Sequence, residues 1–202
     1  MRIGVFGGTF DPIHLGHLVI AEQAREQAAL DEVWFLPSST PPHKRSQPLT
    51  PFDRRADMIE LAIAGNRTFR LERIELEREG PSYTADTLSV LHERHPHSEL
   101  FWLIGSDCLP DLPTWYQPQR IIAQATLLVA TRPDWPMWTT EQLRDALKLP
   151  ADAPIRMQVV NVPQVDFASR DIRRRIASGM SVRYMLPNGV LAYIQDKGLY
   201  RS

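Results

Sequence analysis

Two histidines three positions apart, His14 and His17, stand in the segment GGTFDPIHLGH at residues 7–17. The segment HLVIAEQAREQAAL, which begins at His17, has helical spacing of its apolar residues. Side chains three apart lie on one face of a helix, so the two imidazoles should share the first turn. A helix N-terminus offers unpaired amides and about half a positive charge. This combination predicts a site for a phosphate group.

Three glycines accompany the histidines. Gly7 and Gly8 follow the apolar run IGVF, where they should let the backbone turn sharply and approach a ligand. Gly16 should leave space for a flat ligand group against the backbone. Two histidines could instead bind zinc, but no further Cys or His stands nearby at metal-ligand spacing. We therefore predict a nucleotide phosphate site and no metal held by the protein.

Two later segments could add to such a site. Gly105 and Asp107 follow an apolar run, where Asp107 could contact a ligand or cap the next helix. Ser169 is expected to cap a helix over 168–176 in which Arg173 lies one turn from the start. The single cysteine, Cys108, is expected only to fill space in the core.

Apolar runs and helix-period segments alternate along the chain. Gly65 should end a helix that begins at residue 53, and Thr84 should cap the next one. The alternation predicts an α/β fold: a Rossmann-like, doubly wound parallel sheet with ligands beyond the carboxyl ends of its strands. We expect one domain over 1–202, whose C-terminal helical part covers about 168–202. The strands are expected at 2–6, 32–37, 69–76, 99–105 and 126–131.

Two segments interrupt this alternation. Residues 37–51 hold five of the 17 prolines, with His43, Lys44 and Arg45, and should form an irregular loop. Residues 132–154 are expected to be a peripheral insertion with one helix.

Composition narrows the class of protein. Hydrophobic residues make up 43% and charged residues 23%, and the net charge is -1, as in ordinary soluble domains. No basic excess points to nucleic acid, and no apolar tract is long enough to span a membrane. One cysteine excludes an intrachain disulfide, so we expect a cytoplasmic protein.

The motifs together resemble those of bacterial nicotinate-nucleotide adenylyltransferases. These belong to the nucleotidyltransferase superfamily, which shares H-x-G-H with class I aminoacyl-tRNA synthetases. The first motif is common to several adenylyltransferases, and PSYTADTL and GSDCLPDLPTW narrow the choice. The likeness runs almost end to end: GGTFDPIHLGH, PPHK, RADMIELA, PSYTADTL, GSDCLPDLPTW, DIRRRIASG and LPNGVLAYIQDKGLY.

The resemblance implies a role for each candidate residue. His14, His17 and Arg173 would be catalytic, and Trp115 would stack on the nicotinate ring. Relatives carry threonine where this chain has Arg170, which either binds phosphate itself or points to solvent. ATP would contact Gly7, Gly8, Phe10, His14, Gly16, His17, Gly105, Asp107, Ser169 and Arg173. Nicotinate mononucleotide would contact Thr9, His43, Lys44, Tyr83, Thr84 and Trp115.

The activity implied is adenylyl transfer from ATP to nicotinate mononucleotide, giving deamido-NAD and pyrophosphate, with Mg²⁺ carried by the ATP phosphates. The alternatives are an adenylyltransferase for phosphopantetheine or nicotinamide mononucleotide, and a non-catalytic nucleotide-sensing module. An NAD-dependent oxidoreductase is disfavoured because GGTFDP stands where it would carry G-x-G-x-x-G. The sequence leaves open the oligomeric state, a homo-oligomer included, and the choice between nicotinate and nicotinamide.

Overall fold

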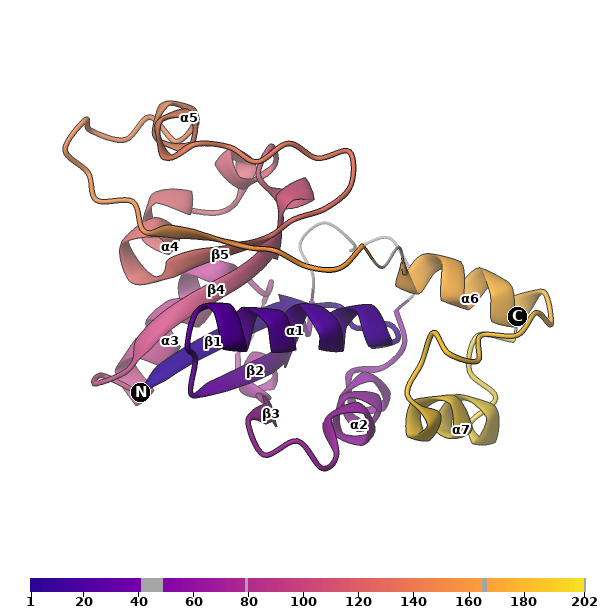
Figure 1. Ribbon diagram of the computed structural model, residues 1–202. Coiled ribbons are helices and arrows are strands. Elements are labelled where there is room, and N and C mark those ends of the chain that lie inside the picture. The colour runs from indigo at the N-terminus through magenta and orange to yellow at the C-terminus, as the bar shows by residue number, and fades with distance from the viewer. Residues whose placement is uncertain (41–48, 79, 165–166, 202) are drawn as a thin grey trace.

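A parallel sheet forms the centre of the protein (Figure 1). The computed structural model describes residues 1–40, 49–78, 80–164 and 167–201. Its six strands run in the order β3-β2-β1-β4-β5-β6, and every neighbouring pair is parallel. The order reverses between β1 and β4, which is where such folds bind ligands. The strands are β1 (Arg2–Gly8), β2 (Glu32–Pro37), β3 (Phe69–Leu71), β4 (Glu99–Gly105), β5 (Thr126–Ala130) and β6 (Met157–Val160).

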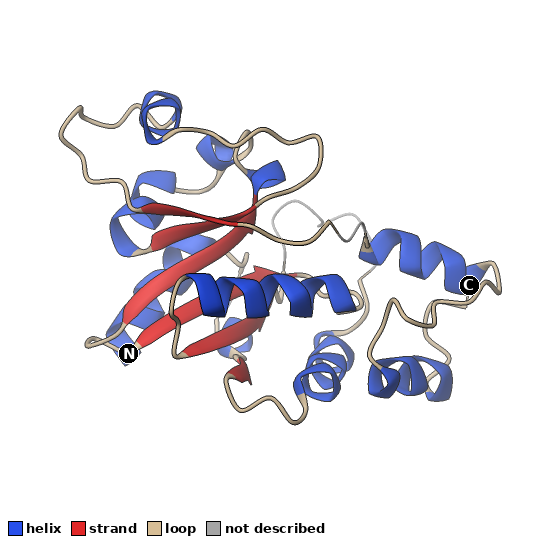
Figure 2. Cartoon of the chain, in the orientation of Figure 1, coloured by secondary structure: helices blue, strands red, loops and turns tan. Residues whose placement is uncertain are grey.

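Helices cover both faces of the sheet (Figure 2). Helices α1 and α2 pack against one face, α3, α4 and α5 pack against the other, and α6 and α7 lie to one side and join the core beneath α1 and α2 (Figure 1). The predicted doubly wound fold with a C-terminal helical part is therefore confirmed. The α-helices are α1 (Leu15–Gln27), α2 (Phe52–Ile63), α3 (Thr84–Arg94), α4 (Pro118–Gln124), α5 (Thr140–Ala146), α6 (Ser169–Ala177) and α7 (Asn188–Asp196).

Strand side chains alternate between two cores. On β2, Phe35 joins the core beneath α1 and α2, whereas its neighbour Trp34 joins the core beneath α3. On β4, Phe101 and Trp102 divide in the same way. Because both faces are covered, the strands read as nearly continuous apolar runs.

The elements differ from expectation in several places, among them β1, which continues to Gly8 rather than ending at residue 6. The strand expected at 69–76 ends at Leu71, and a 3₁₀ helix follows at Ile74–Leu76. There the Ile74 amide donates to the Glu72 carboxylate at 2.9 Å, a local bond that replaces strand pairing. Strand β6 and helix α4 were not predicted: β6 has only four residues and lies at the edge of the sheet.

The two predicted N-caps are each wrong by one residue. Thr84 and Ser169 are the first residues of α3 and α6, and the caps are Tyr83 and Ala168, whose side chains make no capping bond.

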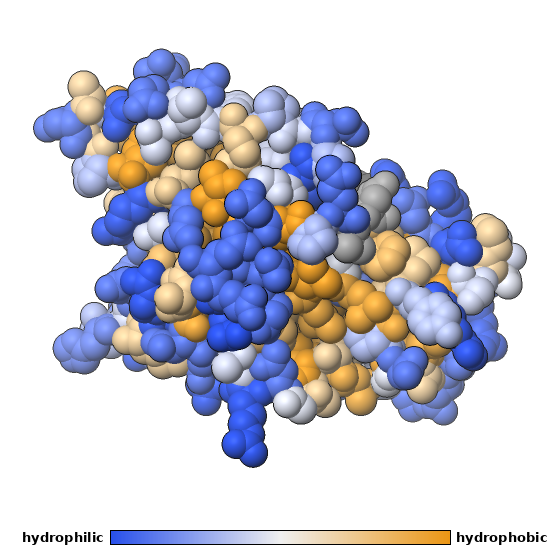
Figure 3. Space-filling view, viewed as in Figure 1, coloured by the Kyte–Doolittle hydropathy of each residue, from blue (hydrophilic) through white to orange (hydrophobic). Residues whose placement is uncertain are grey.

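In the space-filling view, hydrophilic side chains cover α1, and hydrophobic side chains gather beside it toward the C-terminal helices (Figure 3). Leu18, Ile63 and Leu191 are partly buried hydrophobic residues of this side of the sheet.

Candidate active site

The loop that follows β1 turns at Phe10 and not at the glycines. Phe10 has a positive φ of 48°, whereas Gly7 and Gly8 are extended within β1. A Cβ at Gly7 would lie 2.6 Å from Cη2 of Trp102, so this glycine makes room for a side chain of the neighbouring strand. The expected sharp turn at the glycine pair is therefore wrong. Packing against Trp102 is what requires a glycine at position 7.

His14 and His17 lie together, as predicted. Their rings stack with centroids 3.6 Å apart and planes 22° apart. His14 is the N-cap of α1, and its amide donates to Nδ1 of His17 at 3.2 Å. Since Nδ1 of His17 accepts this bond, a neutral His17 carries its proton on Nε2. His17 therefore presents an N–H donor, Nε2–H, on the ring edge that faces away from the His14 amide.

Both imidazoles are held in the neutral state. Burial, and then the charge of Arg132, lower the pKa of His14 to about 4. Burial, then His14 and Arg132, hold the pKa of His17 well below its ordinary value. Nδ1 of His14 is buried without a partner in the described part of the chain. The pair can therefore act as neutral hydrogen-bonding groups.

Two expectations about the start of α1 need correction. The first amide of the helix is not bare, because Leu15 donates to the Met185 carbonyl at 3.0 Å. The space above Gly16 holds the His14 ring, since a Cβ there would lie 3.1 Å from His14 Nδ1. Tertiary contacts of the C-terminal part, which local spacing cannot show, account for the first of these.

The first turns of α6 bind the same loop. Ser169 Oγ donates to the Pro12 carbonyl at 2.9 Å, and Arg173 Nη1 donates to the Asp11 carbonyl at 2.6 Å. The structure therefore brings Ser169 and Arg173 to the histidine loop, as expected of a joint site. Ile172 is buried in the core, and Arg170 is exposed.

Gly105 and Asp107 reach the site from the end of β4. Asp107 does not cap a helix; its carboxylate lies 3.7 Å from Nε of Arg132. Arg132, which follows β5, was missed by sequence reasoning, yet its charge acts on both histidines. Its place just beyond the carboxyl end of a parallel strand is the signal that could have identified it. Burial raises the pKa of the nearby Cys108 thiol to about 11, which fits a packing role.

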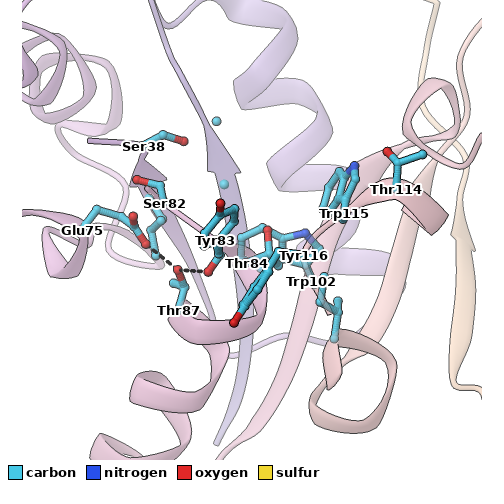
Figure 4. A pocket seen from close by; sticks show the side chains of 14 residues that line it. Ser38, Glu75, Ser82, Tyr83, Thr84, Thr87, Trp102, Thr114, Trp115 and Tyr116 are labelled. Atoms are coloured by element: carbon cyan, nitrogen blue, oxygen red, sulfur yellow. Dashed lines mark hydrogen bonds between the residues drawn. The ribbon is translucent and has the colours of Figure 1, made fainter. Parts of the chain in front are cut away.

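A cavity of about 480 Å³ opens beside the loop, on the other side of the glycine pair. Three residues predicted to contact the mononucleotide, Tyr83, Thr84 and Trp115, line it together with Gly7 and Gly8. Figure 4 shows Tyr116 beside Tyr83 at the start of α3, and Trp115 apart from them on another wall. Tyr83 and Tyr116 stack with ring centroids 4.4 Å apart. The structure thus joins three segments that the sequence could only propose separately.

Several cavity residues were not predicted. Glu75 is 3% exposed, and its carboxylate accepts the Thr87 hydroxyl at 2.5 Å (Figure 4). Trp102 lines the cavity from β4. Because Glu75 belongs to a charged stretch of sequence, it would be expected on the surface, and only the tertiary structure shows that it is buried in the cavity wall. The other unpredicted lining residues are Leu36, Ser38, Ser82, Thr114, Tyr116 and Ile121.

Four predicted contact residues remain: Phe10, Thr9, His43 and Lys44. The side chain of Phe10 is 2% exposed within the core, so any contact with ATP must come from its backbone. The Thr9 carbonyl accepts from Arg55 at 2.7 Å. His43 and Lys44 lie outside the described residues.

The described residues contain no group of three or more His, Cys, Asp or Glu side chains placed to hold a metal ion. Among them, no helix has both the length and the apolar character needed to cross a membrane.

Comparison with known proteins places the chain in a family. The model of the cytidylyltransferase-like family matches residues 5–175. A probable nicotinate-nucleotide adenylyltransferase of Thermomicrobium roseum is 44% identical over 201 residues, which cover 100% of this chain and 92% of that protein. The nicotinate-nucleotide adenylyltransferase of Bacillus subtilis is 39% identical over 201 residues, covering 100% of this chain and 99% of that protein.

A solved structure supports the fold. The nicotinic acid mononucleotide adenylyltransferase of Plasmodium falciparum, complexed with NaAD, superimposes with a TM-score of 0.80 at 19% identity. The match covers 98% of this chain and 97% of that one.

Proposed function

Because the chain belongs to the cytidylyltransferase-like family and, within it, to the nicotinate-nucleotide adenylyltransferases, we propose that it transfers the adenylyl group of ATP to nicotinate mononucleotide. The products are deamido-NAD and pyrophosphate. The enzyme is a nucleotidyltransferase of NAD biosynthesis.

One geometric observation carries the assignment. The stacked histidine pair lies on one side of β1, where His17 contacts Phe6 of one core, and a cavity with aromatic walls lies on the other side, where Gly7, Gly8 and Trp102 of the second core line it. The histidine side, with Arg173 and Asp107, would take the triphosphate and ribose of ATP. The cavity would take the mononucleotide, with its pyridine ring against Trp115 and its carboxylate near the N-terminus of α3. Two nucleotides placed in this way meet at the carboxyl end of β1.

The reaction is a direct displacement. The 5′-phosphate of nicotinate mononucleotide attacks the α-phosphorus of ATP, a new P–O bond forms, and the bond to the β-phosphate oxygen breaks to release pyrophosphate. The nucleophile is already an anion, so the enzyme needs no general base. Catalysis then depends on alignment of the two substrates and on stabilisation of charge in the transition state.

The protein supplies the donors for that charge. Nε2–H of His17 and the guanidinium of Arg173 would donate to phosphoryl oxygens, with His14 packed behind His17. Hydrogen bonds to charged groups contribute about 1.5–3 kcal/mol each, and their value increases where water is excluded. Two or three such bonds would therefore lower the barrier by several orders of magnitude.

We expect Mg²⁺ to enter with ATP. It prefers oxygen ligands and keeps several waters, which phosphate oxygens accommodate. The nearby carboxylates do not form a cage: Asp107 faces Arg132, and both oxygens of Asp11 accept hydrogen bonds from the protein. The ion would belong to the substrate.

We further propose that the enzyme acts in the cytoplasm, as the single cysteine, Cys108, suits a reducing compartment.

A comparison of acceptors tests the proposal. Purified protein would be given ATP and Mg²⁺ with nicotinate mononucleotide, nicotinamide mononucleotide or phosphopantetheine, and pyrophosphate and the dinucleotide product would be measured. We expect the fastest release with nicotinate mononucleotide and an equal amount of deamido-NAD. Release only with phosphopantetheine, or with no acceptor at all, would contradict the assignment.

A further inference from the structure

The C-terminal residues return to the loop after β1 at residues 9–14, which is proposed to bind ATP and is called the ATP loop below. Helix α7 ends at Asp196, and Gly198 and Tyr200 then adopt positive φ values of 60° and 62°. Non-glycine residues adopt this conformation rarely. The ring of Tyr200 packs against the core beneath α1 and α2. The surrounding contacts therefore hold Tyr200 in a fixed, unfavourable backbone conformation.

The hydroxyl of Tyr200 reaches across 189 positions of sequence to Asp11. It donates to Asp11 Oδ1 at 2.6 Å. Asp11 is only 3% exposed. Burial, together with the Asp11 carboxylate, raises the pKa of Tyr200, so the hydroxyl stays protonated and acts as the donor. A short bond to a buried carboxylate is a strong constraint on that carboxylate.

Asp11 connects this tail to the proposed triphosphate site. Its Oδ2 accepts from the amide of Thr50 at 3.3 Å. Its main-chain carbonyl accepts from Nη1 of Arg173 at 2.6 Å. The side chain of Asp11 is thus fixed by Tyr200 and Thr50, and its backbone fixes the guanidinium of Arg173.

A buried arginine completes the scaffold. Arg55 is 1% exposed and donates to three carbonyls, those of Thr9, Ser38 and Thr50, at 2.7–2.8 Å. The Asp11 carboxylate acts on its charge and partly offsets the cost of its burial. The loop is therefore braced from α2 on one side and from the C-terminal tail on the other.

We propose that Tyr200 is a positioning residue for ATP: through Asp11 it sets the place of the Arg173 guanidinium that receives the triphosphate. Tyr200 itself need not touch a substrate. An arginine has five N–H donors, so the bond to the Asp11 carbonyl leaves others for phosphate oxygens. This inference rests on the proposed function, since it assigns Arg173 to ATP.

The test is Tyr200→Phe, which removes only the hydroxyl. We expect about tenfold weaker binding of α,β-methylene ATP with Mg²⁺, a similar loss in kcat/KM for ATP, and an unchanged KM for nicotinate mononucleotide. If the hydroxyl had only a structural role, Tyr200→Phe would lower the thermal midpoint of unfolding and would affect ATP and nicotinate mononucleotide equally.

Tyr193→Phe is the matched control. The hydroxyl of Tyr193, on α7, donates to Asp57 Oδ2 at 2.5 Å, also across a long stretch of sequence, but its partner lies on α2 rather than in the ATP loop. Both variants should lower the thermal midpoint by a similar amount, and only Tyr200→Phe should weaken ATP binding. Equal effects of the two variants on ATP binding would overturn the proposal.

A double-mutant cycle tests the route through Arg173. In an Arg173→Ala background, Tyr200→Phe should add almost no further loss in affinity for the analogue, because the group it positions is absent. Additive losses would show that Tyr200 does not act through Arg173.

The binding assay contains no acceptor, so it also separates the two proposals. A wild-type chain that binds the analogue but transfers no adenylyl group contradicts only the proposed function, whereas one that binds no analogue overturns both.

Discussion

The rings of His14 and His17 stack 3.6 Å apart at the start of α1. Two imidazolium ions would repel one another strongly at this distance, so the stack requires that at least one ring is neutral. The lowered pKa of each ring agrees with this. The arrangement supports a mechanism in which the pair donates hydrogen bonds without carrying charge.

Replacement of His17 tests that mechanism. We expect His17→Ala to lower kcat by roughly 10²–10³-fold, the usual cost of removing one donor to a charged transition state. The fold should survive, although His17 also accepts the His14 amide, so a modest loss of stability is expected. Steady-state kinetics and circular dichroism would measure both. Near wild-type turnover would remove His17 from the mechanism, and the exposed His97→Ala is the control.

Stability should depend on pH through the same pair. The pKa of His14 is about 4 in the folded protein and about 6.5 when unfolded. Between these values the unfolded chain binds more protons than the folded one. The contribution of His14 to the free energy of unfolding should therefore be complete above pH 6.5 and be lost as the pH falls below that value. From pH 7.5 to pH 5 the His14 contribution amounts to about 2 kcal/mol.

Urea denaturation of wild type and His14→Asn at the two pH values would measure this. Asparagine is a good N-cap, so the variant should fold and show a smaller change with pH. The other titrating groups are common to both chains, and burial, the main cause of the low pKa of His17, is kept in the variant, so their contributions largely cancel in the difference. An identical pH dependence in the two proteins would argue against a buried, neutral His14.

Trp115 should contribute to one substrate only. It lines the cavity beside Tyr83 and Thr84. We expect Trp115→Ala to raise the KM for nicotinate mononucleotide by about tenfold, because a stacking surface is lost, and to leave the KM for ATP nearly unchanged. If only the KM for ATP moved, the pyridine ring would be placed wrongly.

Gly7 should tolerate no side chain. A Cβ at this position would lie 2.6 Å from Trp102, so Gly7→Ala should destabilise the protein by about 1–3 kcal/mol. Gly189→Ala on α7 is the control, since its Cβ would meet Leu61 at an ordinary 3.6 Å. Chemical denaturation should show the control unchanged or slightly more stable. Equal stability of both variants would contradict the packing explanation for Gly7.

Much of the fold could be predicted because its signals are local. The apolar runs at 32–37 and 99–105 match β2 and β4 residue for residue. The spacing of His14 and His17 predicted that the two rings lie together, which their stack confirms, although His14 is the N-cap and only His17 lies in the first turn of α1.

The rest depends on contacts between distant segments. No local pattern shows that Trp102 requires a glycine at position 7, or that Tyr200 lies 2.6 Å from Asp11. Arg55 and Glu75 belong to charged runs that read as solvated, yet both are buried because distant groups pair with them.

The structure of a complex with α,β-methylene ATP and Mg²⁺ tests the central claim most directly. We predict that the α- and β-phosphates lie within hydrogen-bond distance of His17 Nε2 and the Arg173 guanidinium, above the loop at residues 9–14. Phosphates bound elsewhere, with the histidine pair free of contacts to the nucleotide, would contradict the account.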